Sequence, residues 1–138
     1  YAVMAKSLQP FCGDDAAPLP MVFVVDDEPM LLDLATMILR RAGFCVRVFS
    51  DPQRALAEFA AAQPPPAVVL TDYAMGAMNG MDLINHCKRL NPAQKVVLVS
   101  GTVDESIYAD APVKPDHFLA KPYQVAKLIE ITRQLAGN

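Results

Sequence analysis

The chain has 138 residues, of which 53% are hydrophobic, and its formal net charge is −3 at pH 7. This length allows one domain with a single core, and the acidic balance argues against nucleic-acid binding, which needs a basic face. No apolar run is long enough to span a membrane and no secretory signal opens the chain, so we expect a cytoplasmic protein.

The first segment of the chain, residues 1–20, contains three prolines and has no sustained hydrophobic period. We interpret it as a flexible N-terminal extension outside the fold, for which an expression-vector origin is one alternative. The first strong strand pattern begins at Met21. The folded domain is therefore expected over residues 21–138.

The first strand is predicted over residues 21–25, and it ends in Asp26-Asp27-Glu28. Pro29 suits the first turn of a helix, and Gly43 is a typical residue just after a helix end. Between them, apolar residues recur at helical spacing. The predicted inner stripe consists of Leu31, Leu34, Ala35, Ile38 and Ala42.

The rest of the chain alternates between strand and helix patterns. Strands are predicted over residues 44–50, 67–71, 95–100 and 117–120, and helices from 52 to the proline run 64–66, over 81–90 and over 124–135. A further helix of about two turns is predicted over 104–110, where Pro112 and Pro115 prevent a longer one. This order of β and α elements predicts a parallel sheet with helices on both faces.

The three cysteines, Cys12, Cys45 and Cys87, lie far apart and have no CxxC spacing. An odd, scattered set favours reduced thiols over a disulfide framework or a zinc site. We therefore expect the cysteines to be reduced.

Polar residues end four of the predicted strands: Asp26-Asp27, Asp72, Ser100 and Lys121. The carboxyl ends of parallel strands share one edge of a sheet, where ligands bind. Two like charges about 4 Å apart cost on the order of 4 kcal/mol near a protein surface, and a divalent cation relieves this repulsion. Oxygen ligands without clustered His or Cys favour Mg²⁺, with Mn²⁺ as an alternative. A lysine and a hydroxyl suit phosphoryl oxygens.

Four motifs in this order, VFVVDDE, LTDYAM…MNG, VVLVSG and FLAKPY, closely resemble the receiver domain of two-component response regulators, of the chemotaxis-receiver type. The resemblance covers about residues 21–136. It implies a flavodoxin-like (βα)5 fold, a doubly wound α/β structure whose five parallel strands take the order 2-1-3-4-5.

The resemblance implies a role for each matching residue. Asp72 matches the phosphoacceptor, which takes a phosphoryl group from a histidine kinase and also binds the metal. Asp27 matches a direct Mg²⁺ ligand, and Asp26 matches the acidic neighbour that usually acts through water. The backbone carbonyl of Ala74 matches the third protein ligand.

Three further positions match the family's switch. Ser100 matches the hydroxyl that bonds the new phosphate, Lys121 the lysine that pairs with it, and Phe118 the aromatic residue that turns inward. From the strand pattern alone, Phe118 is a core residue. The Lys121–Pro122 bond matches a peptide bond that is often cis, and X-Pro is the bond type that permits this.

The chain departs from the family pattern after the phosphoacceptor. Gly76 stands where proline is common, and Ala74 offers no polar side chain. We expect Ala74 and Thr102, which flank the phosphoryl site, to tune phosphoryl hydrolysis. His86 and His117 have no metal or base partner at a suitable spacing, so surface roles are expected for both.

The function implied is that of a phosphoacceptor, not an enzyme, which assists its own phosphoryl transfer and slow dephosphorylation. Its partners would be a sensor histidine kinase or histidine phosphotransfer protein and an unknown downstream protein, reached by protein–protein contact because only two residues follow Ala136. The state expected is a monomer or a weak phosphorylation-dependent dimer.

Three alternatives stay open. The chain could be the receiver piece of a hybrid histidine kinase or of a longer regulator. It could be a phosphohydrolase of the haloacid dehalogenase type, but Ala74 stands where that class needs a general acid. It could also be a receiver-like module that binds partners without phosphorylation, which the intact acidic, Ser and Lys positions disfavour.

Overall fold

The structure is a computed structural model that describes residues 19–76, 78–101 and 108–137, and every structural statement below refers to these residues. Five parallel strands form one sheet in the order β2-β1-β3-β4-β5, which confirms the predicted doubly wound, flavodoxin-like fold. The strands are β1 (Met21–Val25), β2 (Cys45–Phe49), β3 (Val68–Asp72), β4 (Lys95–Ser100) and β5 (His117–Ala120).

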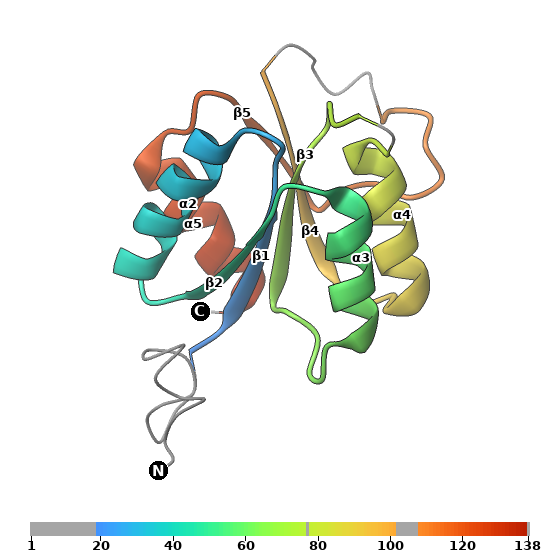
Figure 1. Ribbon diagram of the computed structural model, residues 1–138, viewed down its shortest axis with the longest axis horizontal. Coiled ribbons are helices and arrows are strands. Elements are labelled where there is room, and N and C mark those ends of the chain that lie inside the picture. The colour runs from blue at the N-terminus through green and yellow to red at the C-terminus, as the bar shows by residue number, and fades with distance from the viewer. Residues whose placement is uncertain (1–18, 77, 102–107, 138) are drawn as a thin grey trace.

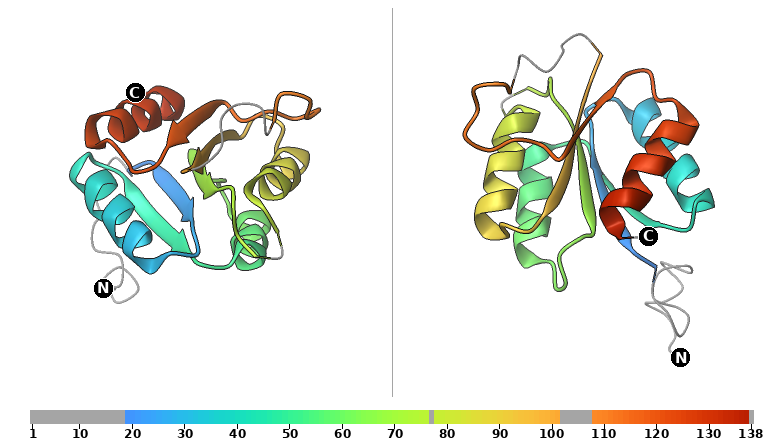
Figure 2. Two further views of the ribbon diagram at one scale, coloured as in Figure 1. Left: turned by 90° about the horizontal axis from the view of Figure 1, so that it is seen from above. Right: turned by 180° about the vertical axis from the view of Figure 1, so that it is seen from behind.

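Helices cover both faces of the sheet in pairs, as Figures 1 and 2 show. The described helices are α2 (Pro29–Arg41), α3 (Pro52–Ala61), α4 (Gly80–Leu90) and α5 (Val125–Ala136). The pair α2 and α5 packs on one face, and α3 and α4 pack on the other. Among the described residues, no helix has both the length and the apolar character needed to cross a membrane.

The core lies in two layers because successive strand residues point to opposite faces of the sheet. Val22 and Val24 of β1 pack with α2 and α5, whereas Phe23 and Val25 pack with α3 and α4. The central strand β3 is buried along all five of its residues. This agrees with its apolar run without alternation, the pattern of a strand covered on both faces.

Local sequence signals set the helix starts. Pro29 and Pro52 stand at the first positions of α2 and α3, where a missing N–H costs no hydrogen bond. The side chain of Asp51 caps α3 by accepting a hydrogen bond from the Gln53 N–H at 3.0 Å. Helix α4 begins with a capping box between Asn79 and Asp82.

The predicted inner stripe of α2 is partly wrong. The buried residues are Leu32, Ala35, Ile38 and Leu39, whereas Leu34 is exposed together with Met30 and Met37. Most positions from Met30 to Leu39 are apolar, so two helix faces have similar periodicity and the sequence does not choose between them. The choice comes from packing against the sheet.

The cysteine prediction is wrong for Cys45, which is disulfide-bonded. Spacing alone does not show which segments the fold brings together, and a disulfide depends on that proximity. Cys87 is a free thiol on the buried face of α4. Burial raises the pKa of the Cys87 thiol to about 12, so this side chain stays protonated and behaves as a small apolar group.

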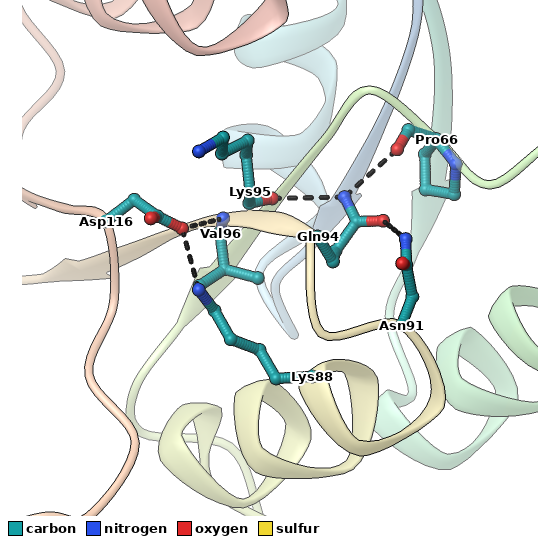
Figure 3. Close-up of polar contacts among 7 residues, drawn as sticks. All are labelled: Pro66, Lys88, Asn91, Gln94, Lys95, Val96 and Asp116. Atoms are coloured by element: carbon teal, nitrogen blue, oxygen red, sulfur yellow. Dashed lines mark hydrogen bonds and ion pairs between the residues drawn. The ribbon is translucent and has the colours of Figure 1, made fainter.

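A polar network lies at the end of the sheet where β4 and β5 begin (Figure 3). The carboxylate of Asp116 accepts hydrogen bonds from the Val96 N–H at 2.8 Å and from Lys88 Nζ at 3.1 Å. The buried amide of Gln94 donates to the carbonyls of Pro66 and Lys95. These bonds tie the starts of β4 and β5 to α4 and to the segment before β3.

The helical turns predicted over residues 104–110 lie largely outside the described residues. Residues 108–110 form a turn, and the chain from there to Asp116 has no regular structure before β5 begins. Tyr108 and Val113 of this segment pack against the layer of the core under α3 and α4. The segment is thus attached to the domain at both the core and the Asp116 network.

Candidate functional site

The C-terminal ends of β1, β3, β4 and β5 lie at one edge of the sheet, at the top of Figure 1. Backbone bonds continue the strand pairing just past these ends: the Asp26 N–H donates to the Phe49 carbonyl at 3.0 Å, and the Lys121 N–H donates to the Ser100 carbonyl at 3.0 Å. Asp72 is the last residue of β3 and pairs with Val99 of β4. The sheet itself therefore fixes the backbone of the predicted site residues.

Lys121 is the centre of the site. Its Nζ lies 3.1 Å from Asp26 Oδ2 and 3.2 Å from Asp72 Oδ1, and both carboxylates are buried. A third carboxylate, that of Glu28, places Oε1 3.3 Å from the same Nζ and is largely exposed. The structure thus joins the ends of β1, β3 and β5 through one ammonium group.

Three carboxylates form an acidic cluster beside this lysine. One carboxylate oxygen each from Asp26, Asp27 and Asp72 lies within 4.8 Å of the other two. Asp26 and Asp72 are buried, and Asp27 is exposed to solvent. These residues come from two strands that are neighbours in the sheet but far apart in the sequence, as the predicted topology requires.

The oxygens of this cluster fit a divalent cation. Asp26 Oδ1 accepts a hydrogen bond from the Glu28 N–H at 2.9 Å. Asp26 Oδ2 is buried and has no hydrogen-bond partner among the described residues, although it forms the ion pair with Lys121. A buried oxygen that lacks a hydrogen bond is costly. An oxygen-only donor set is the type that Mg²⁺ and Mn²⁺ take.

The surroundings of Asp72 disfavour a negative charge on its carboxyl group. Burial of the carboxyl, followed by repulsion from Asp26, raises the pKa of Asp72, and Lys121 offsets only part of this. Burial of the ammonium acts to lower the pKa of Lys121, but its bonds to and attraction by Asp26 and Asp72 outweigh this and raise it. The lysine is therefore charged at neutral pH, while Asp72 has a site that favours its neutralisation by a cation.

The predicted switch residues Ser100 and Phe118 lie on the neighbouring strands β4 and β5. Ser100 is buried at the end of β4 and pairs with Ala120. Phe118 is half-buried in β5, and its ring centroid lies 6.2 Å from that of Tyr108. The Lys121–Pro122 peptide bond is cis, which is the geometry that the resemblance implied.

The remaining predicted residues are exposed, half-buried or outside the described residues. Ala74 is exposed two residues after Asp72, and Thr102 falls outside the described residues. His86 and His117 are half-buried, on α4 and at the start of β5. Neither histidine belongs to the acidic cluster.

Two residues of the site have roles that the sequence analysis missed. Glu28 was interpreted only as part of an acidic run, yet its side chain reaches Lys121 across 93 positions of sequence. Gly80 was given no role beyond its place in the MNG motif, yet it is the first residue of α4 and its N–H donates to the Tyr73 carbonyl at 2.8 Å. The Asn79-x-x-Asp82 capping box was the available signal for the second of these.

The first prediction concerns Gly80. A Cβ at this position would contact the backbone oxygen of Asp72 and lie 2.9 Å from a methyl group of Leu98. Because neither α4 nor β3 can move freely, we expect Gly80→Ala to lower the free energy of unfolding by about 1–3 kcal/mol, measured by urea denaturation. The matched control is Gly101→Ala, whose Cβ would make an ordinary contact at 3.5 Å with Lys121. Equal stability of the two variants would contradict this account.

The family profile described as response regulator receiver domain matches residues 22–133. The probable transcriptional regulatory protein TcrX of Mycobacterium tuberculosis is 31% identical over 116 residues, which cover 83% of this chain and 48% of that protein. The nitrogen assimilation regulatory protein NtrX of Azorhizobium caulinodans is 32% identical, over 82% of this chain and 25% of that protein. The chain spans about half the length of these curated relatives, or less.

Solved structures show the same fold. A response regulator receiver domain protein from Clostridium thermocellum has 26% sequence identity and a TM-score of 0.80, with 86% of this chain and 95% of that chain covered. A response regulator receiver protein from Sinorhizobium medicae also has 26% identity, with a TM-score of 0.77 and 86% and 95% covered.

Proposed function

The chain belongs to the response regulator receiver domain family, and from this premise we propose that it is the phosphoacceptor of a two-component phosphorelay, phosphorylated on Asp72. The donor would be the phosphohistidine of a sensor histidine kinase or of a histidine phosphotransfer protein. The observation that supports this most directly is the position of the Asp72 carboxylate, which is paired with Lys121 and adjacent to two further aspartates.

In the proposed reaction, a carboxylate oxygen of Asp72 attacks the phosphorus atom in line with the bond to the donor nitrogen. That bond breaks, the imidazole nitrogen keeps the electron pair, and Asp72 becomes an acyl phosphate. Mg²⁺, or Mn²⁺, bound by Asp26, Asp27, Asp72 and the Ala74 carbonyl would neutralise charge on the transferring group. This is a phosphoacceptor that assists its own transfer and slow dephosphorylation, rather than a turnover enzyme.

The proposed response to phosphorylation uses the lysine and the hydroxyl. The ammonium of Lys121 pairs with one phosphoryl oxygen and the Ser100 hydroxyl donates to another. Their backbones are already joined by the hydrogen bond from the Lys121 N–H to the Ser100 carbonyl. Phosphorylation would therefore pull the ends of β4 and β5 together, and the Phe118 side chain of β5 would turn inward as the hydroxyl moves.

We propose that the signal leaves through protein–protein contact with a downstream protein, from a monomer or a weak phosphorylation-dependent dimer in the cytoplasm. The length of the relatives supports the alternative that this is the receiver part of a longer regulator or of a hybrid kinase. The net charge of −3 argues against nucleic acid as the partner.

The second prediction tests this function directly. Acetyl phosphate with Mg²⁺ should add one phosphoryl group to the wild-type chain, and chelation of the metal should prevent it, because the uncompensated carboxylates repel the donor. Intact-mass spectrometry measures the addition. A phosphate-ester turnover assay is the counter-test: sustained multiple turnover would favour a phosphohydrolase, and failure to label in Mg²⁺ would reject the phosphoacceptor.

A further inference from the structure

We propose that Glu28 is a resting-state counter-ion of Lys121, which holds a donor of the ammonium group until a phosphoryl oxygen displaces it. This inference rests on the proposed function, since it concerns how the same site is regulated. It assigns to Glu28 a positioning role that acts through Lys121. The argument depends on the number of donors, the exposure of each acceptor and the charge of the incoming group.

The ammonium group of lysine has three N–H donors and no acceptor. In this structure three carboxylates surround it, with oxygens at 3.1, 3.2 and 3.3 Å from Nζ. They belong to Asp26, Asp72 and Glu28 respectively. The contact with Glu28 is also a hydrogen bond, so a phosphoryl oxygen that is to pair with Lys121 competes with Glu28 for a donor of the ammonium group.

The three carboxylates differ in what their release would cost. The side chains of Asp26 and Asp72 are only 1% and 7% exposed, whereas that of Glu28 is 62% exposed. A buried carboxylate that loses its partner is left as an uncompensated charge. An exposed carboxylate regains water and loses little, because ion pairs at the surface are weak. Glu28 is accordingly the carboxylate that leaves.

The backbone around Glu28 allows its side chain to move alone. Its N–H donates to Asp26 Oδ1 at 2.9 Å, and its carbonyl accepts from the N–H groups of Leu31 and Leu32 in the first turn of α2. The side chain makes no capping bond to this helix. Release of Lys121 therefore requires rotation of side-chain bonds and leaves the helix start unchanged.

The charge of Glu28 also opposes the incoming group directly. A phosphoryl group on Asp72 adds negative charge close to the point that Glu28 occupies in the resting state. Removing the charge of Glu28 should thus weaken its contact with Lys121 and lower the repulsion. The expected gain is roughly twofold to fivefold in affinity for a phosphoryl-like anion, the range of an exposed ion pair.

The experiment is a titration of the 138-residue chain with beryllofluoride, a phosphoryl analogue that binds carboxylates, at saturating Mg²⁺, followed by ¹⁹F NMR. The test variant is Glu28→Gln. The matched control is Asp33→Asn, which removes the same charge from an exposed position on α2 that is not one of the three carboxylates at Lys121. Thermal unfolding of both variants monitors the fold.

The expected result is a twofold to fivefold tighter binding of beryllofluoride by Glu28→Gln, a smaller effect of added salt than in wild type, and wild-type affinity for Asp33→Asn. Equal affinities of Glu28→Gln and Asp33→Asn, or weaker binding by Glu28→Gln, would overturn the counter-ion role while leaving the proposed function standing. Absence of binding by the wild-type chain would overturn the proposed function and this inference together.

Discussion

Asp72→Asn is expected to abolish phosphorylation by acetyl phosphate and by any phosphohistidine donor. The amide of asparagine has a weakly nucleophilic oxygen and cannot form a stable acyl phosphate, while its size leaves the packing at the end of β3 unchanged. Intact-mass spectrometry after incubation with acetyl phosphate and Mg²⁺ measures the loss. Labelling of the variant at the wild-type level would remove Asp72 from the reaction.

The control for this variant is Asp51→Asn. Asp51 lies just beyond the end of β2, at the same edge of the sheet, but it caps α3 and is not part of the acidic cluster. Asparagine caps helices about as well as aspartate. Asp51→Asn should therefore fold and accept the phosphoryl group as the wild-type chain does.

The same Asp72→Asn variant should be more stable than wild type in Mg²⁺-free buffer at pH 7. The pKa of Asp72 is raised by burial and then by Asp26, so the folded state binds this proton more tightly than the unfolded state does. Ionisation of Asp72 therefore destabilises the folded state. The free energy of unfolding falls as the pH rises from 3.8 through the raised pKa. Loss of function combined with a gain in unfolding free energy is the signature of a functional charge rather than a structural one.

Lys121→Met is expected to have the largest effect on stability. The substitution leaves the carboxylates of Asp26 and Asp72 buried without a counter-charge. Removing one partner of a buried ion pair costs about 3 kcal/mol or more. We expect a loss of that size in the free energy of unfolding at pH 7, measured by urea denaturation. Addition of Mg²⁺ should restore part of it by neutralising the same carboxylates.

The pH dependence of this loss follows from the carboxyl groups. Because Lys121 lowers the pKa of Asp72, its removal raises that pKa further. The folded variant then gains a proton at a higher pH than the unfolded chain does, so its deficit should shrink as the pH falls toward the carboxyl range. Lys127→Met on the exposed face of α5 is the control, and a deficit that does not change with pH would contradict the assignment.

The sequence predicted much of the fold because several local signals agreed with one another. The buried run of β3 and the proline at the start of α3 each indicate one element, and together they require a parallel sheet. The strand order came from the family resemblance. The inner face of α2 could not be chosen, because Leu34 and Leu32 are equally apolar and only the sheet distinguishes them.

The candidate site was predictable where a residue lies at a strand end, and less so where a side chain reaches across the fold. Asp72 and Lys121 come directly from strand ends. The Glu28–Lys121 contact depends on the length and direction of two side chains, which no spacing rule encodes. The role of Gly80 depends on the distance between α4 and the end of β3, and the pairing of Cys45 depends on tertiary proximity.

The cluster around Lys121 also concentrates negative charge at one end of the sheet. Its four carboxylates and one ammonium carry a formal charge of −3, which equals the net charge of the chain, so all other charged side chains cancel. This end of the sheet therefore attracts cations over about a Debye length, roughly 8 Å at physiological salt. An anionic donor approaching this end meets repulsion until a divalent ion has arrived. For the proposed reaction we therefore expect the cation to bind before the phosphodonor, and the arrival of the cation to slow as salt is added.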